Sequence, residues 1–205
     1  MPGRLCVSGG VLAHDHNGKP NYDGATPFFV ACQNGHKEVV SLLLADIRVD
    51  VNKPTNFVCP PFNIACQEGH IEVVSLLLAD SRIDVMKPNL NQASALFVAS
   101  QNGQLSVVKL LLASGREVNT KLKTIVNPGT WSNKTAAEMA RFQGTRGKEA
   151  GESDEDYSRR NRNGPLIATL LDSFDLDPAT TSQQLRELPE LRDFFISDLK
   201  AQEAP

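Results

Sequence analysis

Apolar residues in the first half of this chain recur with the spacing of short amphipathic helices. The clearest run begins near Lys37, where apolar residues occupy positions i, i+1, i+4 and i+5: Val39, Val40, Leu43 and Leu44. This spacing gathers them into one stripe that a helix can bury against a neighbour. A shorter helix is predicted just before it, from Pro27 to Asn34. Proline is tolerated at the first helical position, and Gly35 suits the left-handed turn that ends a helix.

The same pair of helices is written three times at a fixed period. The three copies are ACQNGHKEVVSLLLAD over 31–46, ACQEGHIEVVSLLLAD over 65–80 and ASQNGQLSVVKLLLAS over 99–114. Their glycines, Gly35, Gly69 and Gly103, lie 34 residues apart. Self-similarity with a period of about 20 to 50 residues is typical of a stacked repeat array. Because the units of such an array contact mainly their neighbours, we expect an extended binding surface rather than a catalytic pocket.

From Asp23 to Asn52 the chain reads DGATPFFVACQNGHKEVVSLLLADIRVDVN. This segment resembles the ankyrin repeat, whose family pattern is close to DGxTPLHxAAxxGHxEVVxLLLxxGADVN. The turn, both helices and the extended finger match in order and then recur. The second repeat departs from the pattern at Val58, which replaces the turn glycine, and at Cys59, which replaces the capping threonine. The resemblance implies an all-α, ankyrin-repeat solenoid of helix-turn-helix units with extended fingers and a helical C-terminal cap.

We expect four repeats within residues 21–174, of which the fourth is divergent. The first three span 21–54, 55–88 and 89–122. The fourth, over 123–174, is split by a charged stretch, 144–164, that has almost no apolar residues. Because this stretch has nothing to bury, we expect it to be a solvated loop, with helical periodicity resuming at Leu166.

The segments that flank the repeats are candidate caps. Repeat arrays need atypical ends that shield the last apolar face. The segment 175–205 carries an apolar pattern, interrupted at Pro189, that predicts a helical C-terminal cap. The N-terminal flank, 1–20, has Leu5 and Val7 among its apolar residues and is a candidate cap at the other end.

Composition and charge are those of an ordinary soluble globular protein. Of the 205 residues, 40% are hydrophobic and 22% are charged. The formal net charge of −3 provides no basic footprint for nucleic acid. No apolar run approaches the roughly 20 residues that span a bilayer, so we expect no membrane insertion. The N-terminus is a poor signal peptide and the four cysteines are scattered. We therefore expect a cytoplasmic protein, with a nuclear location as the alternative.

No pattern in the sequence supports catalysis. It contains no glycine-rich phosphate loop, no nucleophile elbow and no cluster of zinc ligands. Cys6, His14 and His16 have the residue types of a metal site, but nothing holds them in tetrahedral geometry. We therefore expect no enzyme activity, no metal and no cofactor.

The resemblance implies that a protein partner contacts the finger tips and the exposed side of the first helix in each repeat. Each of the four tips carries one large apolar residue: Tyr22-Asp23, Asn56-Phe57, Leu90-Asn91 and Trp131-Ser132. An exposed apolar row marks an interaction site, and aromatic residues are enriched among binding hot spots. The alternative is that adjacent fingers pack these side chains on one another. Beside Trp131, a basic rim is expected from Lys121, Lys123 and Lys134.

Two further sets of polar residues are candidate sites. A polar strip is predicted beside the tips, at the ends of the first helices: Gln33, Asn34, Gln67, Glu68, Gln101 and Asn102. Its alternative explanation is plain solvent exposure. Ser153 is followed by three acidic residues and is a candidate phosphorylation site. Arg159 and Arg160 are near enough in the sequence to form ion pairs with an added phosphate.

These features predict a non-catalytic adaptor or scaffold that holds a segment of a protein partner on its finger tips and inner helices. Two alternatives stay open at this point. The array could be a regulatory or targeting fragment of a larger enzyme, or a purely structural spacer whose tips are packed and inert.

Overall fold

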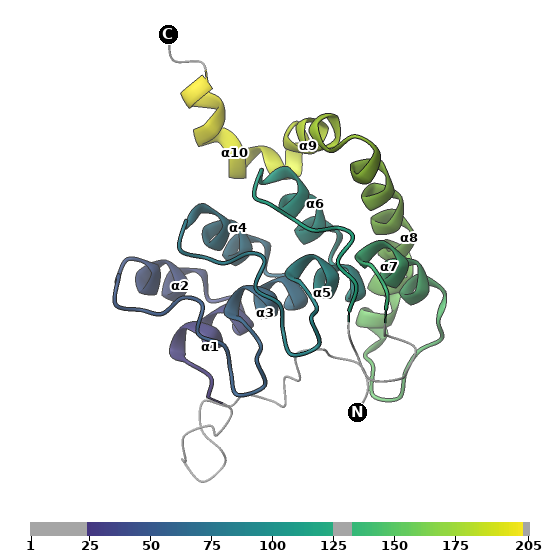
Figure 1. Ribbon diagram of the computed structural model, residues 1–205, viewed down its shortest axis with the longest axis horizontal. Coiled ribbons are helices and arrows are strands. Elements are labelled where there is room, and N and C mark those ends of the chain that lie inside the picture. Colours follow the sequence, from purple (N-terminus) through teal and green to yellow (C-terminus); the bar gives the residue numbers. More distant parts are fainter. Residues whose placement is uncertain (1–23, 125–132, 203–205) are drawn as a thin grey trace.

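The helices predicted from the repeats form a stacked array (Figure 1). The computed structural model describes residues 24–124 and 133–202, and the side chains among them up to Phe195. Within these residues there are ten helices and no strand: α1 (Pro27–Asn34), α2 (Lys37–Leu44), α3 (Pro61–Glu68), α4 (Ile71–Ala79), α5 (Ala95–Gln101), α6 (Leu105–Ala113), α7 (Ala136–Thr145), α8 (Asp154–Leu176), α9 (Pro178–Arg186) and α10 (Pro189–Gln202). The expected all-α solenoid is confirmed.

The helices stack in two rows. In the inner row α1, α3, α5 and α7 lie side by side, and in the outer row α2, α4, α6 and α8 do the same. Local sequence sets the helix ends. The Thr26 side chain accepts a hydrogen bond of 3.1 Å from the Phe29 N–H at the start of α1. At the other end, Gly35 has φ 71°, in the left-handed region that favours glycine.

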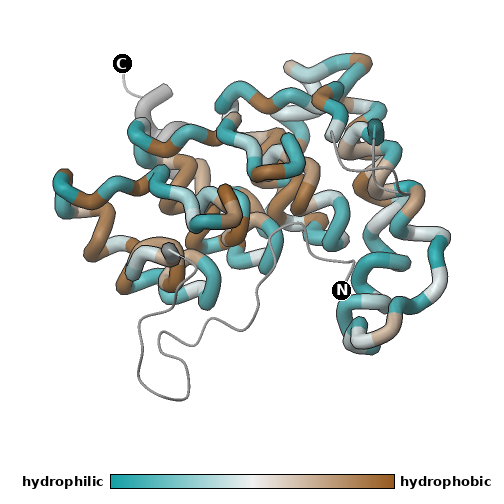
Figure 2. Tube along the Cα trace, turned by 60° about the horizontal axis from the view of Figure 1, so that its bottom comes forward, coloured by the Kyte–Doolittle hydropathy of each residue, from teal (hydrophilic) through white to brown (hydrophobic). Residues whose placement is uncertain are grey.

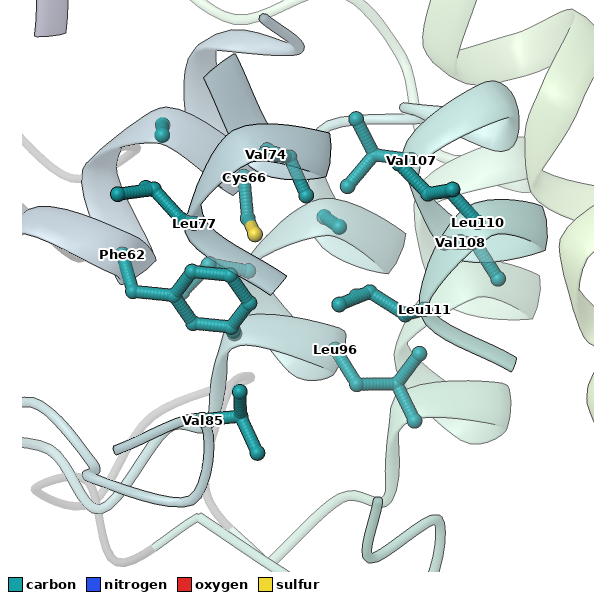
Figure 3. Packing of buried hydrophobic residues seen from close by; sticks show 14 of the residues in the cluster. Phe62, Cys66, Val74, Leu77, Val85, Leu96, Val107, Val108, Leu110 and Leu111 are labelled. Atoms are coloured by element: carbon teal, nitrogen blue, oxygen red, sulfur yellow. The ribbon is translucent and has the colours of Figure 1, made fainter. Parts of the chain in front are cut away.

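The core lies between the two rows. Phe62 and Cys66 of α3 pack with Val74 and Leu77 of α4, as Figure 3 shows from close by. A small residue recurs at the same place in each inner helix: Ala31, Ala65, Ala99 and Ala140 are all buried. The hydrophobic stretches of the chain lie mainly within this helix stack (Figure 2).

The charged stretch 144–164 is mostly helical, so the prediction of a solvated loop is wrong. Helix α8 begins at Asp154, not near Leu166, and continues to Leu176. Ser153 caps it, because its Oγ accepts a hydrogen bond of 3.0 Å from the Asp156 N–H. Three acidic residues occupy its first turn, where the positive end of the helix dipole favours them.

Some polar groups of this stretch are paired within the protein. Arg160 is buried, and its guanidinium meets Glu152 through two bonds, Nε to Oε1 at 2.9 Å and Nη2 to Oε2 at 3.0 Å. Arg159 Nε and Asn163 Nδ2 donate to backbone carbonyls of the third repeat, those of Asn102 and Gly103. Charged and polar residues that suggested a loop are therefore among the contacts that join α8 to the third repeat.

Helices α9 and α10 follow α8 in the chain and lie beside the last two helices of the outer row, α6 and α8. Helix α9 packs on α6. Ser182 Oγ donates to Leu112 O at 2.8 Å, and Arg186 Nε donates to Ala113 O at 2.6 Å. These carbonyls belong to the last turn of α6, where carbonyl groups have no hydrogen-bond donors within their own helix. Helix α9 therefore caps the C-terminal end of α6.

Candidate functional site

The tips of the second and third fingers are tight turns. In the second finger the Val58 N–H donates to Thr55 O at 2.8 Å, which leaves Asn56 and Phe57 as the two central residues. In the third finger the Gln92 N–H donates to Asn89 O at 2.9 Å, so Leu90 and Asn91 hold the same two places. The centre of a turn projects away from the chain, so the sequence located these two tips correctly.

Large apolar side chains at both tips lie on the surface. Phe57 is 54% exposed, Leu90 is 63% exposed and Val58 is 39% exposed. The alternative that adjacent fingers bury these side chains on one another is therefore wrong for both tips. The first finger approaches Asn56 instead. A Cβ added at Gly24 would lie 2.5 Å from Asn56 Oδ1. The Asn56 amide thus spaces the first two fingers, and Phe57 remains accessible.

Val58 belongs to this surface although it was not among the predicted site residues. Its φ is 55°, a left-handed conformation that is a true outlier for a β-branched residue. Gly24 has φ 67° at the equivalent place in the first finger. Strained residues cluster at ligand-binding sites. The sequence did carry the signal, because Val58 stands where the family pattern has its turn glycine.

Val58→Gly should raise the free energy of unfolding by about 1 kcal/mol. Relief of the strain, roughly 1–3 kcal/mol, exceeds the roughly 0.5–1 kcal/mol of chain entropy that glycine adds to the unfolded state. Urea unfolding followed by circular dichroism would measure this change. Val39→Gly in α2 is the matched control and should destabilise, because no left-handed strain is relieved there. A destabilised Val58→Gly protein would show that the turn carries no strain.

The tips of the first and fourth fingers, Tyr22-Asp23 and Trp131-Ser132, lie outside the described residues. The fourth finger is described only at its base. Lys121 and Lys123 are exposed. They lie on either side of Leu122 and precede the pairing of Thr124 with Asn133, whose N–H donates to Thr124 O at 2.9 Å.

The expected basic rim contains an acidic residue as well. The Lys134 ammonium lies 5.5 Å from the centre of the Phe142 ring. Glu138 Oε2 accepts a hydrogen bond of 2.8 Å from the Thr135 N–H. That bond, together with the charges of Lys123 and Lys134, holds the pKa of Glu138 below its ordinary value. Part of the positive charge of the rim is therefore balanced within the protein.

The polar strip is only partly on the surface. Asn34 is exposed, while Gln33, Glu68 and Asn102 are half-buried. Gln67 and Gln101 are buried, so the prediction that they present polar groups to a partner is wrong. The reason is the stacking of the inner row, since α3 and α5 each lie between two inner helices, whereas α1 has one such neighbour.

Other kinds of site find no support in the described part of the chain. Residues 24–124 and 133–195 contain no group of three His, Cys, Asp or Glu side chains that could hold a metal ion. Cys6, His14 and His16 lie outside the described residues. Burial raises the pKa of Cys32 to about 12, so this thiol is not a nucleophile at neutral pH. None of the described helices is long and apolar enough to cross a membrane.

Comparison with protein families agrees with the architecture. A family model described as "Ankyrin repeat" matches residues 23–56, and one described as "Ankyrin repeats (3 copies)" matches residues 49–121. A comparison with curated proteins finds no similar sequence. Repeats of the matched family are generally protein–protein interaction modules and are typically non-catalytic. The two matches, together with the stacked helix pairs, show that residues 23–121 are a short array of ankyrin repeats.

Proposed function

We propose that this protein is a non-catalytic adaptor that binds a segment of a protein partner across its finger tips. The observation that carries the proposal is the exposure of Phe57, Val58 and Leu90 on two adjacent tips. Leu42 and Ile47 of the first repeat are exposed as well, so what distinguishes Phe57, Val58 and Leu90 is their place on two adjacent finger tips, where exposed apolar side chains can form an interaction site. A few apolar anchors of this kind usually supply most of the binding energy of an interface.

The rigidity of the tips favours a preformed binding surface. Cys59 N–H donates to Thr55 Oγ1 at 3.3 Å, and Ala93 N–H donates to Asn89 Oδ1 at 3.0 Å. Both turns are thus braced by a side chain at their first residue. A braced turn loses little conformational entropy when a partner binds, which favours affinity.

The fourth finger and its lysines extend the same proposal. We expect the partner to present an apolar side chain for Trp131, flanked by acidic residues for Lys121 and Lys123. Charges at the rim of an interface mainly increase the association rate. The cytoplasmic or nuclear location and the phosphorylation of Ser153 stay predictions. Ser153 is exposed, and a phosphate there would add negative charge beside the acidic first turn of α8.

The double variant Phe57→Ala with Leu90→Ala should lose its protein partner without losing its fold. Truncation of hot-spot residues costs about 2 kcal/mol or more each, so capture of the partner should fall at least tenfold. Wild-type and variant proteins would be immobilised, exposed to cell extract, and compared by quantitative mass spectrometry. Leu176→Ala removes an even more exposed leucine at the end of α8 and is the control. An unchanged set of captured proteins for the double variant would favour the inert-spacer alternative.

A further inference from the structure

The stacking of the repeats sets the spacing of the exposed apolar side chains on the second and third finger tips. These two fingers lie side by side (Figure 1), and the Asn52 amide joins them: its Nδ2 donates to Arg82 O at 2.6 Å, and its Oδ1 accepts from the Asp84 N–H at 2.9 Å. The inner helices behind the fingers pack on one another, and packed helices are roughly 8–10 Å apart. Phe57 and Leu90, at the centres of the two turns, are therefore on the order of 10 Å apart.

This spacing restricts the backbone conformation of a bound segment. On one face of a β-strand, side chains recur every two residues, so the available spacings are about 6.6 Å and about 13 Å. A polyproline II segment has three residues per turn and rises about 3.1 Å per residue, so residues i and i+3 face the same side about 9.3 Å apart. In an α-helix, residues i and i+7 are about 10.5 Å apart. A polyproline II segment and an α-helix therefore fit the two tips, whereas a β-strand does not.

Polar side chains beside Leu90 distinguish these two conformations. Gln92 is exposed and Asn91 is half-buried, and neither side-chain amide forms a hydrogen bond with the described part of the chain. An amide side chain can both donate and accept hydrogen bonds. A polyproline II backbone has no internal hydrogen bonds and can use such partners, whereas a helix pairs its own backbone groups. The third tip therefore favours a polyproline II segment.

The fingers carry positive charge next to the two turns. Lys53 and Lys87 each precede a turn, and neither forms an ion pair with any described residue. Lys87 Nζ donates to Asn52 O at 2.9 Å, which brings its charge next to Lys53 on the second finger. The nearest acidic residues in the sequence, Asp50 and Asp84, are farther from the turns and accept from backbone N–H groups. Charge complementarity therefore favours an acidic residue in the bound segment.

We propose that the finger tips bind a polyproline II segment of the partner, with apolar residues at positions i and i+3 and an acidic residue beside them. The inference rests on the proposed function and specifies the ligand of the same surface. The second tip contacts one apolar side chain through Phe57, and the third tip contacts the other through Leu90. The acidic residue faces Lys53 and Lys87.

A random peptide library tests the spacing without a prior choice of sequence. Peptides displayed on phage would be selected on the immobilised full-length protein and counter-selected on the double variant Phe57→Ala with Leu90→Ala. Sequencing of the peptides that only the wild type retains should show apolar residues three apart and an excess of Asp and Glu over the unselected library.

The result separates the ligand from the surface. Tip-dependent peptides whose apolar residues lie two, four or seven apart would overturn the polyproline II segment and leave the proposed function standing. If the wild type and the double variant retained the same peptides, or neither retained any, the tips would not be a peptide-binding surface and both proposals would fail.

The charge contact is tested with one selected peptide by fluorescence anisotropy at low salt. Lys53→Glu should weaken its binding at least twofold, and Lys53→Glu with Lys87→Glu at least fivefold. Replacing the acidic residue of the peptide by lysine should restore binding to the double variant. Arg162→Glu with Arg192→Glu changes the net charge equally at exposed positions of α8 and α10 and should bind the peptide as the wild type does. Equal binding by the two double variants would overturn the contact between the acidic residue and the two lysines.

Discussion

Arg160→Ala is expected to lower the free energy of unfolding by about 3–5 kcal/mol, because it leaves the Glu152 carboxylate buried without its partner. The two side chains are 4% and 13% exposed and are joined by two parallel hydrogen bonds. Arg160 also donates to the Gln143 carbonyl at the end of α7. Its loss therefore removes contacts that join α8 to α7 and to the segment before α8. Urea unfolding followed by circular dichroism would measure the change.

Two further variants make this result specific. Arg162→Ala removes an exposed arginine from the same helix and should change stability by less than about 0.5 kcal/mol. Combining Arg160→Met with Glu152→Leu should recover much of the loss, because neither buried charge then remains. If Arg160→Ala were as harmless as Arg162→Ala, the stretch 144–164 would be the solvated loop that its charges suggest.

Gly164→Ala is expected to destabilise the protein by about 1–3 kcal/mol. A Cβ added at Gly164 in α8 would lie 2.6 Å from the Ala140 carbonyl oxygen and 3.0 Å from the Cα of Gly144, both in α7. Alanine favours a helix over glycine by about 0.5–1 kcal/mol, which works in the opposite direction. The clash outweighs that gain because both neighbours are backbone atoms and cannot turn aside.

The thermal midpoint is the convenient measurement for this variant. Each kcal/mol corresponds to about 2–4 °C for a domain of this size, so the midpoint should fall by several degrees. Gly147→Ala is the matched control, because nothing lies within 4 Å of a Cβ added there. A midpoint for Gly164→Ala at or above that of the wild type would mean that α7 and α8 are not in close contact.

The local signals of the repeats were sufficient to predict the helix pairs and two of the finger tips. Thr26, Pro27 and Gly35 set the ends of α1 through contacts within a few residues. Asn56-Phe57 and Leu90-Asn91 lie at the centres of turns that close over four residues. Interactions of this short range depend on neighbours in the sequence, so a repeated pattern determines them each time it occurs.

Only the tertiary structure decided which side chains of equivalent positions are free. Val39 and Val73 stand in nearly the same local sequence, but one is half exposed and the other is buried, because only α4 lies between two outer helices. Gln33 and Gln67 differ for the same reason in the inner row. Arg160 looks like part of a solvated loop until Glu152 and α7 surround it. The sequence by itself determined the repeating unit, whereas the burial of charge and the exposure of equivalent side chains depend on which units become neighbours in space.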